Sequence, residues 1–408
     1  MRILYALDTY RPNIDGVAIS SERIAQGLAR RGHDIAVVAP GRQLNDYAEI
    51  LEGLPVYRVR ALRVLSDRWW MPVLPSGGVE RAIVSFRPDV VIITLPFLLS
   101  RAAVASARKL GVPVVGVTGT MPEWLLANLP LPRGLAARAN PALWRHFAAY
   151  YNQCEAVVGV TRTALRLLQE HGLVRPGHVV SNGVSLQRFR PRARDRALAA
   201  RFGVDDRPAV LYAGRLDAEK RMDVWFRAAA VLRRRHVDAQ YLIVGDGSER
   251  ERLERMARHL GIAGDVRFIG FLTDRDYEHV FSLANVFAIA STAELQSIVT
   301  LEAAASGLPV VAVNAGALPE LVTEGANGYL FAPDDVDGLA AGIARILQDN
   351  RLARGMGWAS RLIARQHDIE RSVREYERIC SSLSGQDAGL RTGWRKYGSQ
   401  SYGEATRA

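Results

Sequence analysis

Lysine is scarce in this chain. Among 408 residues only Lys109, Lys220 and Lys396 are lysines, although lysine and arginine together number 53 and the formal net charge is +11. Arginine therefore carries almost all of the basic charge, and the arginines are scattered along the sequence. A basic surface can bind nucleic acid or an anionic membrane. Dispersed arginine does not by itself indicate either partner, and we expect no nucleic-acid partner.

Cysteine and long apolar runs are also rare. Cys154 and Cys380 are the two cysteines and lie far apart, which is typical of free thiols in a reducing cytoplasm. No run approaches the roughly 18 consecutive apolar residues of a transmembrane helix. The N-terminus enters an apolar strand at once, without the apolar core and cleavage site of a signal peptide. We expect a cytoplasmic location, which leaves room for peripheral contact with the inner face of the membrane.

The glycine fingerprint of dinucleotide-binding folds, G-x-G-x-x-G, is missing. The alternation that normally surrounds it is present, because residues 2–7 are expected to form a strand, 17–31 an amphipathic helix, and 35–39 are apolar again. The alternation resumes at residue 209, after a connection near 185–205. At about 100–200 residues per domain, the length predicts two or three domains. The predicted fold class is α/β with parallel sheets.

The stretch 285–317 has the clearest pattern of expected secondary structure in the chain. It reads as an apolar strand, a small polar loop with Glu294, a helix from about Ile298 to Gly307, and a second apolar strand. The N–H groups at the start of such a helix attract a phosphate. Glu294 would be repelled by that phosphate, so we expect it to face neutral hydroxyls. Glu302, about two turns into the helix, can reach a second hydroxylated group, and the pattern therefore indicates a nucleotide sugar.

Glu294 and Glu302, followed by the string A-A-A-S-G-L-P-V-V over 303–311, resemble the E-x7-E signature of retaining family 4 glycosyltransferases. The resemblance covers nearly the whole chain. It implies the GT-B fold, in which two facing Rossmann-like domains have parallel sheets and a C-terminal helix crosses back to the N-terminal domain. It divides the chain into an acceptor domain at 1–188, a nucleotide-sugar domain at 189–360, a crossover helix at 361–383 and a flexible tail at 384–408.

In the second half, the string G-R-L-D-x-x-K resembles the diphosphate-binding loop of the family. The resemblance implies that Arg215 and Lys220 carry the chemistry together with Glu294, which would hold the 3- and 4-hydroxyls of the sugar, while Glu302 would hold the ribose. The string V-R-F-I-G-F over 266–271 resembles the family's contact to the nucleotide base. The implied donor-binding residues are Gly16, Gly245, Phe271, Leu295, Gln296, Ser297, Ile298, Val299 and Glu302.

The first half departs from the family at several positions, and Gly119 is the one that bears on catalysis. Where the family usually has T-x-H-T after a strand, with the histidine beside the reacting sugar, this chain has Gly119 followed by Thr120. The P-x-x-x-G-V loop that contains Asp15 resembles the family loop that meets the donor diphosphate and the acceptor. Trp69 and Trp70 lie in a stretch punctuated by proline and glycine, which would line an acceptor pocket, contact a membrane interface or pack over its own domain. These five residues are the acceptor-side residues we expect.

The sequence thus predicts a retaining, metal-independent glycosyltransferase that moves a hexosyl or larger unit from a UDP- or GDP-linked sugar. The nucleotide sugar is a co-substrate, and we expect neither a cofactor nor a metal. Asp274 and Asp276 form a loose D-x-D pattern, which we interpret as the capped start of a helix. The oligomeric state and the linkage atom stay open.

Two classes of acceptor fit the sequence. Gly119 empties a polar space beside the reacting carbon, and this slightly favours a small polar metabolite of a specialised biosynthetic pathway. The alternative is a diacylglycerol-type lipid or a cell-envelope glycan. Outside glycosyl transfer, the same fold could support nucleotide-sugar epimerisation, or a catalytically impaired protein that binds sugar nucleotides without transferring them.

Overall fold

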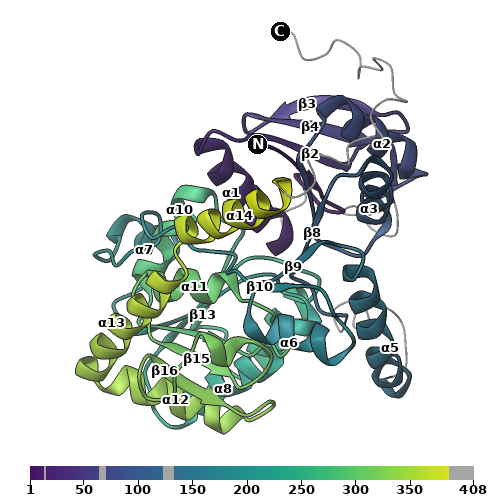
Figure 1. Cartoon of the computed structure of the whole chain (residues 1–408). Helices are drawn as coiled ribbons and strands as arrows, with labels where there is room; N and C mark the ends of the chain where they lie inside the picture. Colours follow the sequence, from purple (N-terminus) through teal and green to yellow (C-terminus); the bar gives the residue numbers. More distant parts are fainter. Residues whose placement is uncertain (13–14, 64–69, 123–132, 386–408) are drawn as a thin grey trace. The chain divides into compact units, whose positions relative to one another are not determined.

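The computed structural model describes residues 1–12, 15–63, 70–122 and 133–385. The chain forms two compact units (Figure 1). The first unit comprises the described parts of 1–122, 133–182 and 369–385, and the second comprises 183–368. Each unit has strands in a parallel sheet and helices between them, which confirms the predicted fold class.

The first unit is built on one large sheet. Its strands are β1 (Arg2–Ala6), β2 (Asp34–Pro40), β3 (Tyr47–Leu51), β4 (Leu54–Val59), β7 (Val90–Ile93), β8 (Val114–Thr118), β9 (Ala156–Gly159) and β10 (Gly177–Val179). They lie in the order β10-β9-β8-β7-β1-β2-β4-β3, with β3 antiparallel to β4 and the other neighbours parallel. A separate antiparallel pair is formed by β5 (Ala61–Arg63) and β6 (Trp70–Pro72). The helices are α1 (Gly16–Arg30), α2 (Pro75–Phe86), α3 (Leu98–Leu110), α5 (Arg133–Tyr151), α6 (Arg162–Glu170) and α14 (Ile369–Ser384).

Helix α14 packs against α1 in the first unit (Figure 1). The approach is very close, because a Cβ atom at Gly27 would lie 2.3 Å from a methyl carbon of Val373. At the end of α1, Arg31 Nε donates to a carboxylate oxygen of Glu377 at 2.8 Å, and His33 Nε2 lies 2.9 Å from the other oxygen. A glycine contact and an ion pair therefore join the last helix of the chain to the first.

The second unit is built on a fully parallel sheet. Its strands are β11 (Ala209–Ala213), β12 (Gln240–Val244), β13 (Val266–Gly270), β14 (Val286–Ile289), β15 (Val310–Val313) and β16 (Gly328–Phe331). The order is β13-β12-β11-β14-β15-β16. The helices are α7 (Arg196–Arg201), α8 (Met222–Arg234), α9 (Arg250–His259), α10 (Asp274–Val280), α11 (Ile298–Ala305), α12 (Val336–Gln348) and α13 (Asn350–Gln366), with short 3₁₀ turns η1 (Ala218–Lys220), η2 (Phe281–Leu283) and η3 (Leu318–Glu320).

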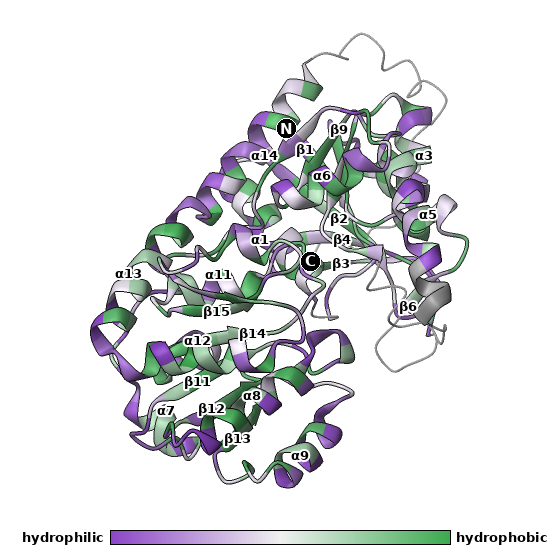
Figure 2. Cartoon of the chain, turned by 90° about the horizontal axis from the view of Figure 1, so that it is seen from below, coloured by the Kyte–Doolittle hydropathy of each residue, from purple (hydrophilic) through white to green (hydrophobic). Residues whose placement is uncertain are grey.

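The pattern of apolar residues explains these layers. Strands β11 and β14 are buried along their whole length, as expected for parallel strands that are covered on both faces. Helix α14 alternates between hydrophilic and hydrophobic residues along its length (Figure 2), since only one of its faces is buried. Across the described residues, no helix combines the length and the apolar character needed to cross a bilayer.

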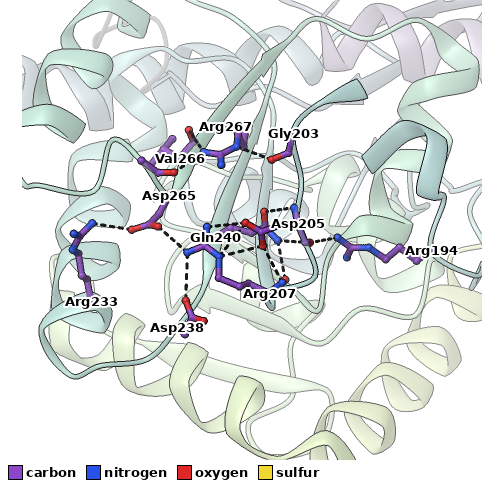
Figure 3. Close-up of polar contacts among 11 residues, drawn as sticks. Arg194, Gly203, Asp205, Arg207, Arg233, Asp238, Gln240, Asp265, Val266 and Arg267 are labelled. Carbon is purple, nitrogen blue, oxygen red and sulfur yellow. Dashed lines mark hydrogen bonds and ion pairs between the residues drawn. The ribbon is translucent and has the colours of Figure 1, made fainter. Parts of the chain in front are cut away.

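The amino ends of β11, β12 and β13 carry a dense polar network (Figure 3). Arg207 donates to Asp205 at 3.0 Å, to Asp265 at 2.8 Å and to Asp238 at 3.3 Å. The fully buried Gln240 donates to the backbone carbonyl oxygens of Asp205 and Arg207, both at 2.8 Å. The network ties together the loops that lead into three neighbouring strands.

The structure divides the chain differently from the prediction at two places. The second unit begins at Gly183 rather than at residue 189, because Val184 and Phe189 are fully buried in its core. The stretch predicted as one crossover helix at 361–383 contains the end of α13, a break, and α14. At the break His367 lies in a turn and Asp368 forms an isolated parallel bridge with Val184, whose amide donates to the carbonyl oxygen of His367 at 2.8 Å. Nearly all of the predicted tail at 384–408 lies outside the described residues.

Candidate active site

The predicted catalytic residues of the second unit converge where its strand order reverses. From the neighbouring strands β11 and β14 the chain proceeds outward in opposite directions, to β12 and β13 on one side and to β15 and β16 on the other. Open α/β sheets bind ligands outside the carboxyl ends of the strands at such a point. Arg215 and Lys220 follow β11, and Glu294 follows β14. The two loops therefore meet at the position expected for a ligand.

Lys220 and Glu294 are in direct contact. The Lys220 Nζ atom donates to Glu294 Oε1 at 2.8 Å, and the two side chains are only 18% and 13% exposed. The residues are 74 positions apart in the sequence. A partly buried ion pair at a ligand-binding edge brings one cation and one hydrogen-bond acceptor to the same spot.

Arg215 is held by carboxylates of its own loop. Its guanidinium pairs with Asp217 and donates to Glu219 at 2.7 Å, and the Glu219 side chain is only 7% exposed. Asp217 in turn accepts from the amide and the hydroxyl of Ser248, at 3.2 Å and 3.0 Å. The sequence analysis did not identify Glu219, although its i, i+4 spacing from Arg215 is a recognisable signal.

A buried tyrosine fixes the backbone of the same loop. The Tyr212 hydroxyl donates to the carbonyl oxygen of Arg215 at 2.8 Å. Burial raises the pKa of Tyr212 well above its ordinary value, and the nearby carboxylates of Glu294 and Glu219 raise it further. The hydroxyl therefore stays protonated at neutral pH and remains a donor.

Gly245 has a structural reason to be glycine. Its φ is +120°, and a Cβ atom there would lie 1.9 Å from the carbonyl oxygen of Gly214. Its amide donates to the carbonyl oxygen of Gly270 at 2.8 Å, next to Phe271, which is 70% exposed at the carboxyl end of β13. The close packing of these loops requires the glycine, whatever ligand lies above it.

The loop of Glu294 is fixed at both of its ends. Ser297 caps α11, since its Oγ atom accepts from the amide of Thr300 at 3.3 Å, and Ile298 and Val299 form the first turn. The amides of a first turn have no partner inside the helix and can meet an anion. On the other side, the carbonyl oxygen of Glu294 accepts from the amide of Ala317 at 2.8 Å. Leu295 and Gln296, between these anchors, are buried.

Glu302 lies deeper than the rest of the predicted donor site. It is 2% exposed, and its Oε2 atom accepts from the Tyr277 hydroxyl at 2.8 Å. Tyr277 lies on α10 and packs edge-on against Phe189 and Phe281. Tyr277 was not identified from the sequence, because nothing local links it to a residue 25 positions away.

The loose D-x-D pattern begins a helix. Thr273 occupies the N-cap position of α10 but makes no side-chain capping bond, and the side chain of Asp274 lies outside the described part. Asp276 pairs with Arg201. Within the described residues, no group of three or more His, Cys, Asp or Glu side chains is arranged to hold a metal.

The predicted acceptor-side residues lie in the first unit, and so does Gly16. Asp15 caps α1 by accepting from the amide of Ala18 at 2.8 Å, and Gly16 is the exposed first residue of that helix rather than part of the preceding loop. Thr120 is half-buried. Trp69 lies outside the described residues.

Gly119 opens onto a hollow of about 370 Å³, counting the open space at its mouth, which we call the Gly119 hollow. A Cβ atom at Gly119 would meet only Val160, at 3.9 Å, so a side chain would fit there. The hollow is also lined by Tyr5 and Thr94, whose buried hydroxyls have no hydrogen-bond partner in the described part of the chain. Gly119 therefore leaves room for a larger side chain, and that this space adjoins the reacting carbon stays a prediction.

Trp70 is half-buried and lines a second hollow, of about 240 Å³ including its open mouth, which we call the Trp70 hollow. Thr9, Tyr10 and Arg42 also line it. It lies beyond the carboxyl ends of β1 and β2. The structure thus places Gly119 and Trp70 at two different hollows of the first unit.

Comparisons with known proteins identify the family of the chain. The family model described as Glycosyltransferase Family 4 matches residues 14–188, and the one described as Glycosyl transferases group 1 matches residues 195–362. A GDP-mannose-dependent alpha-mannosyltransferase of Mycobacterium tuberculosis is 31% identical over 334 residues, covering 81% of this chain and 84% of the relative. A GDP-mannose-dependent alpha-(1-6)-phosphatidylinositol monomannoside mannosyltransferase of the same organism is 36% identical over 378 residues, covering 88% and 92%.

Among solved structures, a sucrose-phosphate synthase from Thermosynechococcus elongatus has a similar fold, with a TM-score of 0.76 over 94% of this chain and 99% of that one. Its sequence identity is 18%, so this likeness concerns the fold. The relatives in sequence extend over most of both chains, and the two family models together span nearly the whole protein. The protein therefore belongs to glycosyltransferase family 4 and is a glycosyltransferase of the GT-B type.

Proposed function

We propose that the protein transfers a mannosyl or related hexosyl unit from a nucleotide sugar to an acceptor hydroxyl, with retention of the anomeric configuration and without a metal ion. The observation that carries the proposal is the contact of Lys220 with Glu294 at the point where the strand order of the second unit reverses. The names of the two mannosyltransferase relatives support GDP-mannose as the first donor to test.

In the proposed reaction, the bond between the anomeric carbon and the diphosphate oxygen breaks as the acceptor oxygen attacks from the same face. The acceptor proton goes to the departing diphosphate. Lys220, Arg215 and the amides at the start of α11 would stabilise the charge that builds on that diphosphate. Glu294 would hold the sugar hydroxyls, and Glu302 would hold the ribose. This scheme differs from that of glycosidases, in which two carboxylates act as acid and nucleophile or base.

For the acceptor we propose a hydroxyl on a lipid-linked polyol. The relative named for a phosphatidylinositol mannoside supports this choice, and such an acceptor would bring the protein to the inner face of the membrane. The second candidate is a small polar metabolite. The observation that favours it is the Gly119 hollow, where open space lies beside two buried hydroxyls of the first unit.

The test is release of nucleoside diphosphate by the purified protein from GDP-mannose, UDP-glucose and UDP-N-acetylglucosamine. Each donor is offered alone, with lipid vesicles and with a soluble metabolite extract, before and after dialysis against EDTA, and products are identified by mass. We expect acceptor-dependent release from one donor that EDTA does not reduce. Release from no donor would favour a protein that only binds sugar nucleotides, and full dependence on added Mn²⁺ would overturn the metal-free mechanism.

A further inference from the structure

Helix α13 packs on the second unit through one of its faces. The buried residues of this inner face are Met356, Gly357, Ser360 and Ala364. The packing is close, because a Cβ atom at Gly357 would lie 2.2 Å from the carbonyl oxygen of Gly307, just after α11. The helix lies at the surface of the unit (Figure 1), and the residues of its other face are exposed.

The outer face of α13 has arginines around a single tryptophan. Arg351, Arg354 and Arg365 are exposed, and Trp358 between them is 68% exposed. At about 100° of rotation per residue, these four residues and the half-buried Leu362 fall within about 80° of the helix circumference, opposite the inner face. We call these five residues the Trp358 face, which is about 21 Å long at a rise of about 1.5 Å per residue.

The positive charge of the Trp358 face is not neutralised within the described part of the chain. Helix α13 contains no aspartate or glutamate. The guanidinium groups of Arg351, Arg354 and Arg365 make no hydrogen bond or ion pair with any residue that the structure describes. Arg361 on the same helix differs, because it donates to two backbone carbonyl oxygens at 2.6 Å.

Other exposed arginines of the second unit do have partners. Three of them, on α8 and α9, each pair with a carboxylate three or four residues away, in the pairs Arg227–Asp223, Arg252–Glu249 and Arg255–Glu251. The carboxylate nearest to α13 in sequence, that of Asp349, accepts instead from the amides of Arg351 and Leu352, both at 2.9 Å. The three arginines of the Trp358 face are therefore available to an anionic partner from outside the chain.

An anionic lipid surface matches both kinds of side chain on the Trp358 face. Arginines next to a membrane are attracted to anionic head groups. An indole ring is favoured at the membrane–water interface, where its apolar body contacts lipid and its N–H stays in water. The indole of Trp358 and the guanidinium groups beside it can therefore contact the same lipid surface.

Two other partners fit the Trp358 face less well. A second copy of the same face would bring arginines together, and like charges placed opposite each other are unfavourable. A protein partner needs more area, because a strip about 21 Å by about 10 Å is well below the roughly 800 Å² per partner of a stable interface. Charge and area therefore favour lipid.

We propose that the Trp358 face docks onto an anionic phospholipid surface, with the indole of Trp358 among the head groups and the three guanidinium groups on lipid phosphates. The contact is reversible, because one aromatic ring and three cations provide no deep apolar anchor. That docking brings the enzyme to a lipid-linked acceptor rests on the proposed function, whereas the docking itself does not.

The first experiment is sedimentation of the whole chain with vesicles. One set contains phosphatidylcholine alone, and the other contains phosphatidylcholine and phosphatidylglycerol at about two to one. We expect binding to the mixed vesicles at low salt and little binding to phosphatidylcholine. Binding should be lost at about 0.5 M NaCl, because salt screens charges at a surface.

Two variants test the residues of the face. Replacing Arg351, Arg354 and Arg365 together by glutamine should weaken binding to the mixed vesicles about 100-fold, at about fivefold for each arginine. Trp358→Ala should weaken it about tenfold. These side chains are exposed, so both variants should fold, and circular dichroism checks this.

Each variant has a matched control. The charge control combines Arg227→Gln, Arg252→Gln and Arg255→Gln, which removes the same net charge from α8 and α9. The apolar control is Val174→Ala in the first unit, where Val174 is 82% exposed. Both controls should bind the mixed vesicles as the natural chain does.

Three results would overturn the proposal. The first is absence of binding to the mixed vesicles, which would assign the face to an acidic protein instead. The second is equal binding by the natural chain and the triple variant of α13. The third is an equal loss of binding in the charge control, because net charge and not this face would then cause the attraction.

The docking and the proposed function can fail separately. Release of nucleoside diphosphate is measured on the same preparation, with the donors and acceptors of the test for the proposed function. Turnover of a donor by a chain that binds neither kind of vesicle contradicts only the docking. Binding to the mixed vesicles without turnover of any donor contradicts only the proposed function.

Discussion

The amino and carboxyl ends of the β11–β16 sheet are both charged, but the charge is held in different ways. At the amino ends, Arg207 contacts the three carboxylates of Asp205, Asp238 and Asp265 (Figure 3). The arginine is 28% exposed, while Asp205 is 47% and Asp238 is 72% exposed. This network lies at the amino ends of the strands, whereas the ligand is predicted at their carboxyl ends.

At the carboxyl ends one ion pair is more enclosed than the rest of the charged groups. Lys220 and Glu294 form an ion pair, and each side chain is less than 20% exposed. Their loops follow the neighbouring strands β11 and β14, from which the chain continues toward opposite edges of the sheet. The loops are braced by the Tyr212 hydroxyl and by the close contact of Gly245 with Gly214. The comparison teaches that the same kind of ion pair has two uses, since the exposed network joins segments of the chain and the enclosed pair positions groups for a ligand.

The largest expected effect is that of Glu294→Gln. An amide of the same shape cannot form an ion pair with Lys220, nor hold sugar hydroxyls as a carboxylate does, so we expect turnover to fall by about 10³-fold or more. The measurement is nucleoside diphosphate released per enzyme, with circular dichroism to confirm folding. Glu251→Gln on α9, where the side chain is 89% exposed, is the control and should be fully active. Turnover within about tenfold of the natural protein would contradict the role of Glu294.

Lys220→Ala should have the next largest effect. Removing one cation that stabilises the leaving diphosphate is expected to lower turnover by roughly 10²–10³-fold. The chain offers a matched control in Lys109→Ala, since Lys109 also pairs with a glutamate, Glu80, at 2.8 Å but is 60% exposed in the first unit. Equal rates for the two lysine variants would show that the loop after β11 does not meet the diphosphate.

A smaller effect is expected from Tyr277→Phe. The ring still packs against Phe189 and Phe281, but Glu302 loses the hydrogen bond that orients it. We expect the donor KM to rise about tenfold with little change in kcat, at a loss of about 1 kcal/mol in the free energy of unfolding. Glu302→Ala should raise the donor KM further in the same sense. A fall in kcat at unchanged KM would instead place the pair in the chemical step.

The smallest effect is expected from Arg207→Met at the amino ends of the strands. Turnover should stay unchanged while Tm falls by roughly 2–4 °C, because exposed ion pairs contribute about 1 kcal/mol or less. Arg207 lowers the pKa of Asp205 below its ordinary value of 3.8. A carboxyl with a lowered pKa stabilises the fold above that value, and the contribution is lost as pH falls through the lowered pKa. The difference in Tm should therefore be full at pH 7 and shrink below about pH 3.8.

Local patterns were sufficient to predict the strand–loop–helix unit that contains Glu294. The expected strand became β14, the helix began at Ile298 as predicted, and Gly307 follows its end with φ of +82°. Apolar runs, the Ser297 cap and a glycine stop act over a few residues, so they can be recognised in sequence. The family resemblance identified the fold class and the family in the same stretch.

Other features depend on packing between distant segments and could not be predicted. No periodicity links Tyr277 to Glu302, or places Trp70 at the same hollow as Tyr10, because such proximity arises only when separate elements meet. The break between α13 and α14 was missed for a similar reason. There the backbone pairs with Val184 instead of continuing a helix, and amphipathic residues lie on both sides of the break.

The first unit is discontinuous in sequence, and this affects the order in which the two units can complete their folds during synthesis. The described part of the second unit is the continuous segment 183–368, so this segment is complete before α14 has been made. The face of α1 around Gly27 has to wait for Val373, and until then it is open to water and to other chains. Domains generally fold as units while the chain emerges. The first unit is therefore synthesised first but completes its fold last. Loss of α14 would leave the buried face of α1 without the helix that packs against it.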